Sequence, residues 1–253
     1  MSTYNLHYNN CRSNYKGEDG PSVYNLTVDT SLIKTNDLVP IIADKIKTKI
    51  DKMEGCFEDD HAYRLNDWFD IEEISQYADI VMPIIEKEIF SSNLKVEFVQ
   101  PYRNKMEGKE ATSWIWHYDD CPQEFIKLFL YLNEVTPTSG CLEYIEKKIY
   151  THRVSPHYTT GVQFYPRSRV PPSEIRKFID DGLEIQQLTG PQGTSAIFTP
   201  NIIHRATIPK KGSNLRDAIV FYLRPCLSKQ ESYINKETYS YLPERNVKEY
   251  ELN

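Results

Sequence analysis

Three side chains of the types that bind transition metals stand at positions that could close one metal site. His117 and Asp119 are two positions apart in a Trp-His-Tyr-Asp segment, and side chains at i and i+2 of an extended strand project from the same face. His204 follows a second short run of β-branched and aromatic residues. Two imidazoles and one carboxylate on one face of a metal leave positions open, as in iron(II) oxygenases. A closed zinc site would need a fourth protein ligand.

Arg216 adds a second element to this pattern. It lies twelve residues after His204 and opens the strand-like run RDAIVFYLRP. A guanidinium can hold a carboxylate through two parallel hydrogen bonds, so Arg216 is a candidate for binding the distal carboxylate of a dicarboxylic co-substrate. The metal triad followed by an arginine on a strand is more specific than either part alone.

Simpler explanations exist for each residue. The chain has 6 His and 36 acidic residues, so one His-x-Asp is unremarkable. His117 could be a core histidine paired with Asp119, and Arg216 an ordinary surface residue. Asp120 is the alternative carboxylate, but its i+3 offset from His117 points it to the other strand face. The remaining histidines lack a matching partner pattern and are assigned surface or structural roles: His7, His61, His152 and His157.

Short strands are predicted to carry these residues. From Leu94 onward the chain consists of short β-branched or aromatic segments separated by turn signals, including Thr136–Gly140. This pattern of short strands and turns favours a sandwich or barrel over an α/β fold. Before Leu94, apolar residues at helical spacing predict helices over 38–53 and 71–90. Pro83 is expected to kink or split the second helix.

The expected organisation is one domain over residues 1–253. Residues 1–93 form a helical and irregular N-terminal buttress, with an irregular or extended lead-in over 1–30. Residues 94–230 form the β core, with an insertion near 152–182 that ends in a short helix. Residues 231–253 are a C-terminal tail. No composition break indicates a second domain.

Composition excludes several classes of protein. The net charge of −6 and the lack of a long basic run argue against nucleic-acid binding. Five scattered Cys without zinc-like spacing indicate reduced thiols in the cytoplasm. No apolar run approaches the roughly 20 residues that cross a bilayer, and the polar N-terminus lacks a signal-peptide core. We therefore expect a soluble, cytoplasmic protein without a membrane or nucleic-acid partner, as a monomer or weak homo-oligomer.

Over Leu94 to Pro225 the chain resembles the phytanoyl-CoA dioxygenase-like family of iron(II)/2-oxoglutarate oxygenases. The likeness rests on WHYDD, FIKLFLYLNEVTPTSGCLEYI, GPQGTSAIFTPNIIHRAT and RDAIVFYLRP. It implies a mainly β fold with flanking helices and a double-stranded β-helix (jelly roll, cupin-like) core. On this resemblance His117, Asp119 and His204 match the metal ligands, and Arg216 matches the arginine that binds 2-oxoglutarate.

The resemblance also implies residues of the co-substrate pocket. Phe129 matches an aromatic position that lines it. Lys127 and Tyr131 share the inward face of Phe129 by alternation and are weaker candidates for the same pocket or for the substrate, the alternative being a packed barrel interior with a snorkelling lysine. The family often has Arg-x-Ser at Arg216. Here the third residue is Ala218, so a hydroxyl contact to the co-substrate must come from elsewhere.

The implied cofactors are Fe(II), 2-oxoglutarate and dioxygen, with ascorbate in support. The expected activity is hydroxylation of a small-molecule substrate with decarboxylation of 2-oxoglutarate to succinate. Asp119 favours this outcome because related halogenases have a small residue in its place. Desaturation or cyclisation by the same cofactors, a catalytically silent cupin-like binding protein and a mononuclear metal hydrolase are the alternatives. Substrate contacts are expected from the N-terminal third and from the insertion.

Overall fold

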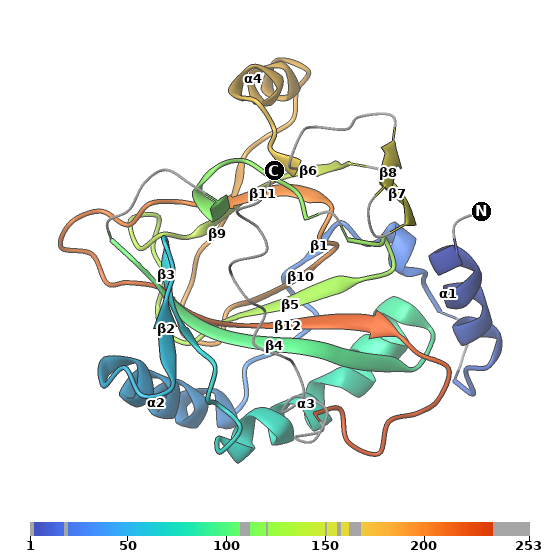
Figure 1. Ribbon diagram of the computed structural model, residues 1–253, viewed down its shortest axis with the longest axis horizontal. Helices are drawn as coiled ribbons and strands as arrows, with labels where there is room; N and C mark the ends of the chain where they lie inside the picture. The colour runs from blue at the N-terminus through green and yellow to red at the C-terminus, as the bar shows by residue number, and fades with distance from the viewer. Residues whose placement is uncertain are drawn as a thin grey trace.

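Two antiparallel sheets face each other and form the centre of the protein (Figure 1). The computed structural model describes residues 3–17, 20–106, 112–119, 121–149, 151–155, 158–161 and 168–234. The larger sheet contains, in spatial order, β1 (Val28–Asp29), β10 (Ser195–Phe198), β5 (Ile126–Tyr131), β12 (Asp217–Pro225), β4 (Leu94–Asn104), β3 (Ala62–Leu65) and β2 (Cys56–Glu58). The smaller sheet contains β11 (Ile202–Ala206), β6 (Leu142–Lys148) and β9 (Gln186–Leu188).

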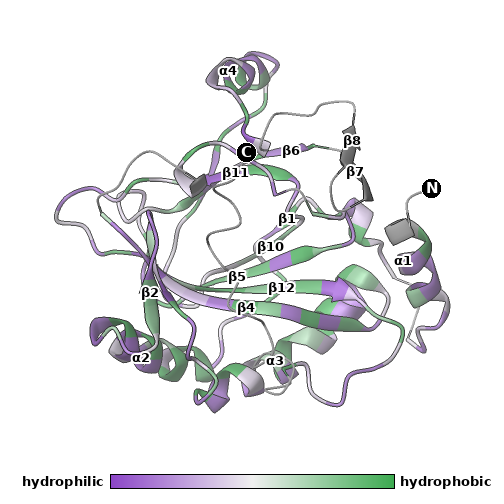
Figure 2. Cartoon of the chain, viewed as in Figure 1, coloured by the Kyte–Doolittle hydropathy of each residue, from purple (hydrophilic) through white to green (hydrophobic). Residues whose placement is uncertain are grey.

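Two helices, α2 (Leu38–Asp51) and α3 (Glu72–Ile85), cover the outer face of the larger sheet (Figure 1). The predicted amphipathic pattern explains their placement, because the apolar positions of each helix are the buried ones. Figure 2 shows apolar residues along the central strands and alternating apolar and hydrophilic residues along the two helices. The mainly β fold with flanking helices is therefore confirmed.

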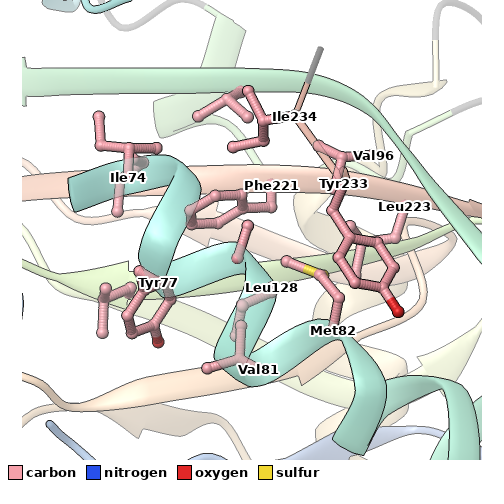
Figure 3. Close-up of a cluster of buried hydrophobic side chains, with 14 of the residues drawn as sticks. Ile74, Tyr77, Val81, Met82, Val96, Leu128, Phe221, Leu223, Tyr233 and Ile234 are labelled. Atoms are coloured by element: carbon pink, nitrogen blue, oxygen red, sulfur yellow. The ribbon is translucent and has the colours of Figure 1, made fainter. Parts of the chain in front are cut away.

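The strand β12 packs on both of its faces. Phe221 points to the helices, where its ring stacks on Tyr77 of α3 with centroids 5.9 Å apart (Figure 3). Val220 and Tyr222 point to the space between the sheets, because alternate residues of a strand face opposite ways. Truncation of a buried Phe such as Phe221 to Ala costs about 3–5 kcal/mol. The two helices thus stabilise β12, the strand whose other face carries Val220 and Tyr222 towards the cavity.

Pro83 was expected to kink or split the second helix, and it does not split it. It lies inside α3, which continues to Ile85 and passes into a π-helical turn over Glu86–Phe90. The residue is exposed, so water can bind the carbonyl that loses its N–H partner. The turn ends at Ser91, whose φ of 46° is left-handed.

The expectation of an irregular or extended stretch over residues 1–30 is wrong for its first part, which forms the helix α1 (Thr3–Ser13). Its residues are mediocre helix formers, and tertiary contacts compensate. The buried Tyr8 donates a hydrogen bond to the carbonyl of Phe90 (2.6 Å) and accepts one from the backbone N–H of Val23 (3.1 Å). These bonds fix α1 on the end of the π-helical turn.

The insertion near 152–182 contains a hairpin, β7 (Thr151–Ser155) and β8 (Tyr158–Gly161), which was not predicted. The short helix predicted at its end is present as α4 (Pro172–Asp180). The C-terminal tail lies outside the described residues beyond Ile234. Among the helices that the structure describes, none combines the length and apolar character needed to span a membrane.

Candidate active site

The predicted metal ligands converge at one end of the space between the sheets. His204 lies on β11, and the segment of His117 runs beside it rather than forming a regular strand. The two residues exchange backbone hydrogen bonds of 3.0 and 2.8 Å, and the N–H of Asp119 donates to the carbonyl of Pro200 (2.8 Å). These bonds keep the segment extended, so His117 and Asp119 share a face as the i and i+2 argument requires. Asp120, the alternative carboxylate, lies outside the described residues.

The donor atoms of His117, Asp119 and His204 lie within 4.8 Å of one another. Nε2 of His117 is 4.0 Å from Asp119 Oδ1, and Nε2 of His204 is 3.8 Å from Asp119 Oδ2. Each imidazole donates its Nδ1 proton to the carbonyl two residues earlier, that of Ile115 or Ile202, at 2.8 Å. A carbonyl only accepts, so each Nε2 carries the lone pair that binds a metal. The donor set fits a divalent cation.

The charge states of the three residues also fit a metal. Burial lowers the pKa of His117 to about 3 and that of His204 to about 4, so both imidazoles are neutral near pH 7. Burial alone would raise the pKa of Asp119, but the charge and hydrogen bond of Lys127, together with the two neighbouring imidazoles, lower that pKa. Metal ligation requires neutral imidazoles and an ionised carboxylate, and the site provides both.

Lys127 is the cation beside the triad. It is buried on β5 and forms an ion pair with Asp119 Oδ2. Burial would lower the pKa of the ammonium, but Asp119 raises it instead, so Lys127 stays charged. Its Nζ lies 5.0 Å from the centre of the Tyr222 ring. The snorkelling alternative does not apply, because the ammonium points inward to a carboxylate.

Arg216 occupies the other end of the same space. It is 3% exposed, and its Nη2 donates to the Tyr102 hydroxyl at 3.1 Å. Within the described residues its Nε and Nη1 atoms are buried without a hydrogen-bond partner. Unpaired buried donors on a charged group are costly, so this guanidinium fits a carboxylate bound between it and the triad. Asn104 fixes its backbone by accepting from the Arg216 N–H (2.7 Å).

A cavity of about 130 Å³ joins the two ends. Strand register explains which side chains line it, since residues paired across antiparallel strands face the same way. One row runs from Tyr222 to Lys127 and Phe198, and the next from Gln100 to Val220 and Phe129. Of the predicted site residues, those that line the cavity are His117, Asp119, Lys127, Phe129, His204 and Arg216.

Tyr131 is placed differently. It lies in the neighbouring row on β5, and its hydroxyl donates to the carbonyl of Leu188 (2.9 Å) and accepts from the N–H of Leu142 (3.1 Å). Both bonds join the larger sheet to the smaller one. Tyr131 is not among the described residues that line the cavity, and its position matches the alternative of a packed barrel interior.

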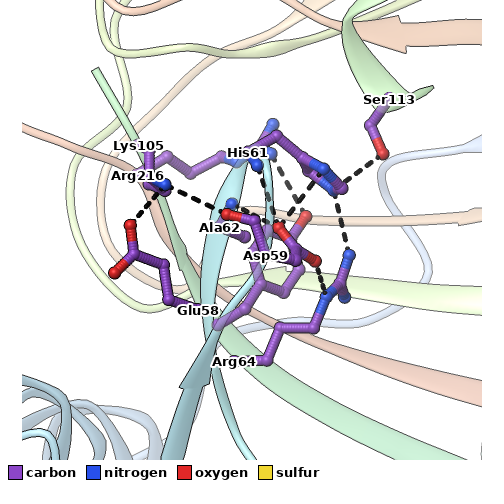
Figure 4. Close-up of polar contacts among 9 residues, drawn as sticks. Glu58, Asp59, His61, Ala62, Arg64, Lys105, Ser113 and Arg216 are labelled. Atoms are coloured by element: carbon purple, nitrogen blue, oxygen red, sulfur yellow. Dashed lines mark hydrogen bonds and ion pairs between the residues drawn. The ribbon is translucent and has the colours of Figure 1, made fainter. Parts of the chain in front are cut away.

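Sequence reasoning missed the polar wall of the cavity, formed by residues of and near β3. His61, assigned to a surface or structural role, is largely buried and lines the cavity beside Arg64 and Ser113. Its Nε2 lies 3.0 Å from Arg64 Nη2 and 3.1 Å from Ser113 Oγ. Both contacts are drawn in Figure 4. The sequence Ala-Tyr-Arg-Leu of β3 does not alternate between apolar and polar residues, and nothing local indicated that this hairpin extends the larger sheet.

No family model matches the chain, and no curated protein matches it by sequence. Solved structures do match. A structure of SnoN, a non-heme alpha ketoglutarate dependent epimerase from nogalamycin biosynthesis, has a TM-score of 0.55 at 9% identity, covering 87% of this chain and 84% of SnoN. SnoN in complex with Fe3+, alpha ketoglutarate and nogalamycin RO gives a TM-score of 0.56 at 11% identity over the same shares.

A third match is EctD from S. alaskensis with 2-oxoglutarate and 5-hydroxyectoine. Its TM-score is 0.54 at 14% identity, with 78% of this chain and 71% of EctD covered. At these identities the likeness concerns the fold. The double-stranded β-helix fold that the sequence resemblance implied is therefore confirmed.

Proposed function

We propose that the protein is an iron(II)- and 2-oxoglutarate-dependent oxygenase that hydroxylates a small molecule. One observation carries this proposal. The ligand atoms of His117, Asp119 and His204 converge within 4.8 Å in the same cavity as Arg216, whose Nε and Nη1 have no partner among the described residues. A metal with open positions and a carboxylate-binding arginine together suit a chelating dicarboxylic co-substrate.

In this proposal each residue has a separate task. Nε2 of both histidines and one oxygen of Asp119 hold the metal, and Arg216 holds the distal carboxylate of 2-oxoglutarate. Tyr102 supplies the hydroxyl contact that Ala218 lacks, since its oxygen already accepts from Arg216 and its proton remains to donate. Phe129 forms an apolar wall. The bound metal and co-substrate supply the oxidation chemistry, while the protein orients them and limits access of water.

Hydroxylation is the outcome that Asp119 favours. A carboxylate at this position occupies the place that a halide would need. Among the structural neighbours, SnoN is described as an epimerase, and EctD is described with a hydroxylated compound, 5-hydroxyectoine. Both are consistent with oxidation of small molecules. Desaturation or cyclisation would use the same cofactors and would be recognised from the mass of the product.

The direct test is conversion of 2-oxoglutarate to succinate. The purified protein is incubated in air with Fe(II), ascorbate and 2-oxoglutarate, with and without a panel of small molecules, and succinate is quantified. We expect succinate that depends on iron and is abolished in His204→Ala. Absence of succinate under all conditions, together with no binding of iron or 2-oxoglutarate, would indicate the alternative of a protein that kept the fold without catalysis.

A further inference from the structure

The charged side chains of the cavity carry an excess of positive charge. Among the described residues that line it, Arg64, Lys127 and Arg216 are cationic and Asp119 is anionic. Asp59, which pairs with Arg64, lies next to the cavity and adds a second negative charge. The lining histidines contribute none: His117 and His204 each donate Nδ1–H to a backbone carbonyl and keep Nε2 unprotonated for a metal, and Nε2 of His61 accepts a hydrogen bond from Arg64. One positive charge remains unbalanced.

The proposed cofactors do not remove this excess. A divalent metal and the dianion of 2-oxoglutarate cancel each other, so the loaded cavity keeps the same imbalance. A buried charge without a counterion is unfavourable, and the cavity should therefore attract one further anion. The imbalance is a local property, because the whole chain has a net charge of −6.

Arg64 is the cation placed to bind that anion. It lies opposite Tyr102 in the register of β3 and β4, and its Cζ is 5.6 Å from the centre of the Tyr102 ring. Arg216 lies 5.5 Å from the same ring. Arg216 is the arginine assigned to 2-oxoglutarate, and Arg64 is available for a second anion in the same cavity.

Asp59 and His61 hold the Arg64 guanidinium in place. Nε of Arg64 donates to Asp59 Oδ2, and Nη2 donates to His61 Nε2 at 3.0 Å (Figure 4). Because Nε2 accepts this bond, the neutral imidazole carries its proton on Nδ1, which faces Asp59 Oδ1 at 3.3 Å. In the part of the chain that the structure describes, Nη1 of Arg64 has no hydrogen-bond partner. The guanidinium is therefore held in one orientation, and its Nη1 edge stays available to bind a ligand.

Lys127 adds positive charge to the same cavity as Arg64. Its ammonium lies above the Tyr222 ring, and both Lys127 and Tyr222 line this cavity. When a metal binds Asp119, the attraction between that carboxylate and Lys127 weakens, because a divalent cation now shares it.

We propose that the substrate of this site carries a carboxylate or phosphate group, which Arg64 binds through its outer edge while Lys127 supplies further positive charge. This inference rests on the proposed function for the position of the metal and 2-oxoglutarate. It adds a substrate class, that of anionic small molecules, and a specificity-determining residue, Arg64.

The test compares probes of similar shape and different charge. The protein is loaded with Fe(II) and 2-oxoglutarate without oxygen, and the visible charge-transfer absorption of the chelate is recorded first. Butyrate, propyl phosphate and butyramide are then titrated by calorimetry. We expect at least one anion to bind about tenfold more tightly than the amide, since charge-assisted hydrogen bonds are the stronger ones. Preference for butyrate or for propyl phosphate identifies a carboxylate or a phosphate ester.

Two variants test whether Arg64 causes the preference for the anionic probes. Arg64→Gln should abolish the preference for the anion and leave the chelate absorption unchanged. Arg224→Gln removes the same charge from β12, where Arg224 pairs with Glu97 away from the cavity, and should keep the preference. Equal binding of anions and amide, or no binding of either anion, overturns the inference if the chelate absorption is present. Loss of the absorption in the unmodified protein would count against the proposed function instead.

Discussion

The ammonium of Lys127 forms an ion pair with Oδ2 of Asp119, the same oxygen that lies 3.8 Å from His204 Nε2. Lys127 therefore neutralises the carboxylate on the side where a metal would bind it. Without a metal, this pair stabilises a buried charge. With a metal, the ammonium is a like charge close to a divalent cation.

Replacement of Lys127 by Met should separate these two effects. We expect the metal-free variant to lose about 3 kcal/mol of unfolding free energy, since Asp119 is left without a counterion. The same variant should bind Mn(II) or Co(II) about tenfold more tightly, because a repulsive charge is gone. Chemical denaturation and metal titration measure the two quantities. Lys95→Met replaces a half-buried lysine of β4 that pairs with Glu97 and is the control. Weaker metal binding in Lys127→Met would contradict the view that Lys127 repels the metal.

Gly140 supports the Arg216 end of the site from a distance. Its φ is +84°, and a Cβ there would lie 2.0 Å from Nδ2 of Asn104, which anchors the backbone of Arg216. Gly140→Ala should therefore displace Asn104 and weaken 2-oxoglutarate binding about tenfold or more. Gly212 has the same φ of +84° with nothing within 4 Å of its Cβ. Gly212→Ala has the same backbone strain and should leave the dissociation constant of 2-oxoglutarate unchanged; equal effects in both variants would show that only strain matters.

His61 should make stability depend on pH in a defined direction. Burial lowers its pKa to about 4, from an ordinary 6.5, with the charges of Arg64 and Arg216 contributing. Below pH 6.5 the unfolded chain binds a proton that the folded protein does not, so the free energy of unfolding falls as pH drops towards 4. A shift of this size corresponds to at most about 3 kcal/mol. Above pH 6.5 this contribution is constant.

The variant His61→Gln isolates this contribution, since the other histidines titrate equally in both proteins. Unfolding free energies at pH 7.5 and pH 5 give a difference for each protein. We expect the loss of stability at pH 5 to be smaller in the variant. An identical loss in both would mean that His61 takes up its proton equally in the folded and unfolded chains.

The sequence predicted the residues of the candidate site better than their surroundings. His117 and Asp119 could be found because strand geometry relates neighbours in the chain. His204 and Arg216 could be found from the order of the motifs and from the family resemblance, and the structure brings all four residues to one cavity. The polar wall could not be predicted in this way. Arg64 reaches the cavity only because β3 pairs with β4 at the edge of the larger sheet, and pairing between distant strands leaves no local periodicity.

The helix α1 and the π-helical turn escaped prediction for a related reason. Tyr8 is held by Phe90, 82 positions away in the chain, and such a contact overrides the modest helix propensity of the segment. Pro83 was expected to kink or split its helix because propensity describes an isolated helix. In the folded protein, buried residues on both sides of Pro83 pack on the sheet and keep the helix continuous.

The central claim is that His117, Asp119 and His204 hold iron(II) while Arg216 holds 2-oxoglutarate. The most direct measurement is an anaerobic titration of the Fe(II)-loaded protein with 2-oxoglutarate, followed by the visible charge-transfer absorption of the chelate. We predict a saturable absorption in the unmodified protein, none in His204→Ala, and in Arg216→Gln a dissociation constant for 2-oxoglutarate raised by about a hundredfold, as for loss of a bidentate ion pair. Unchanged absorption and affinity in both variants would contradict the claim.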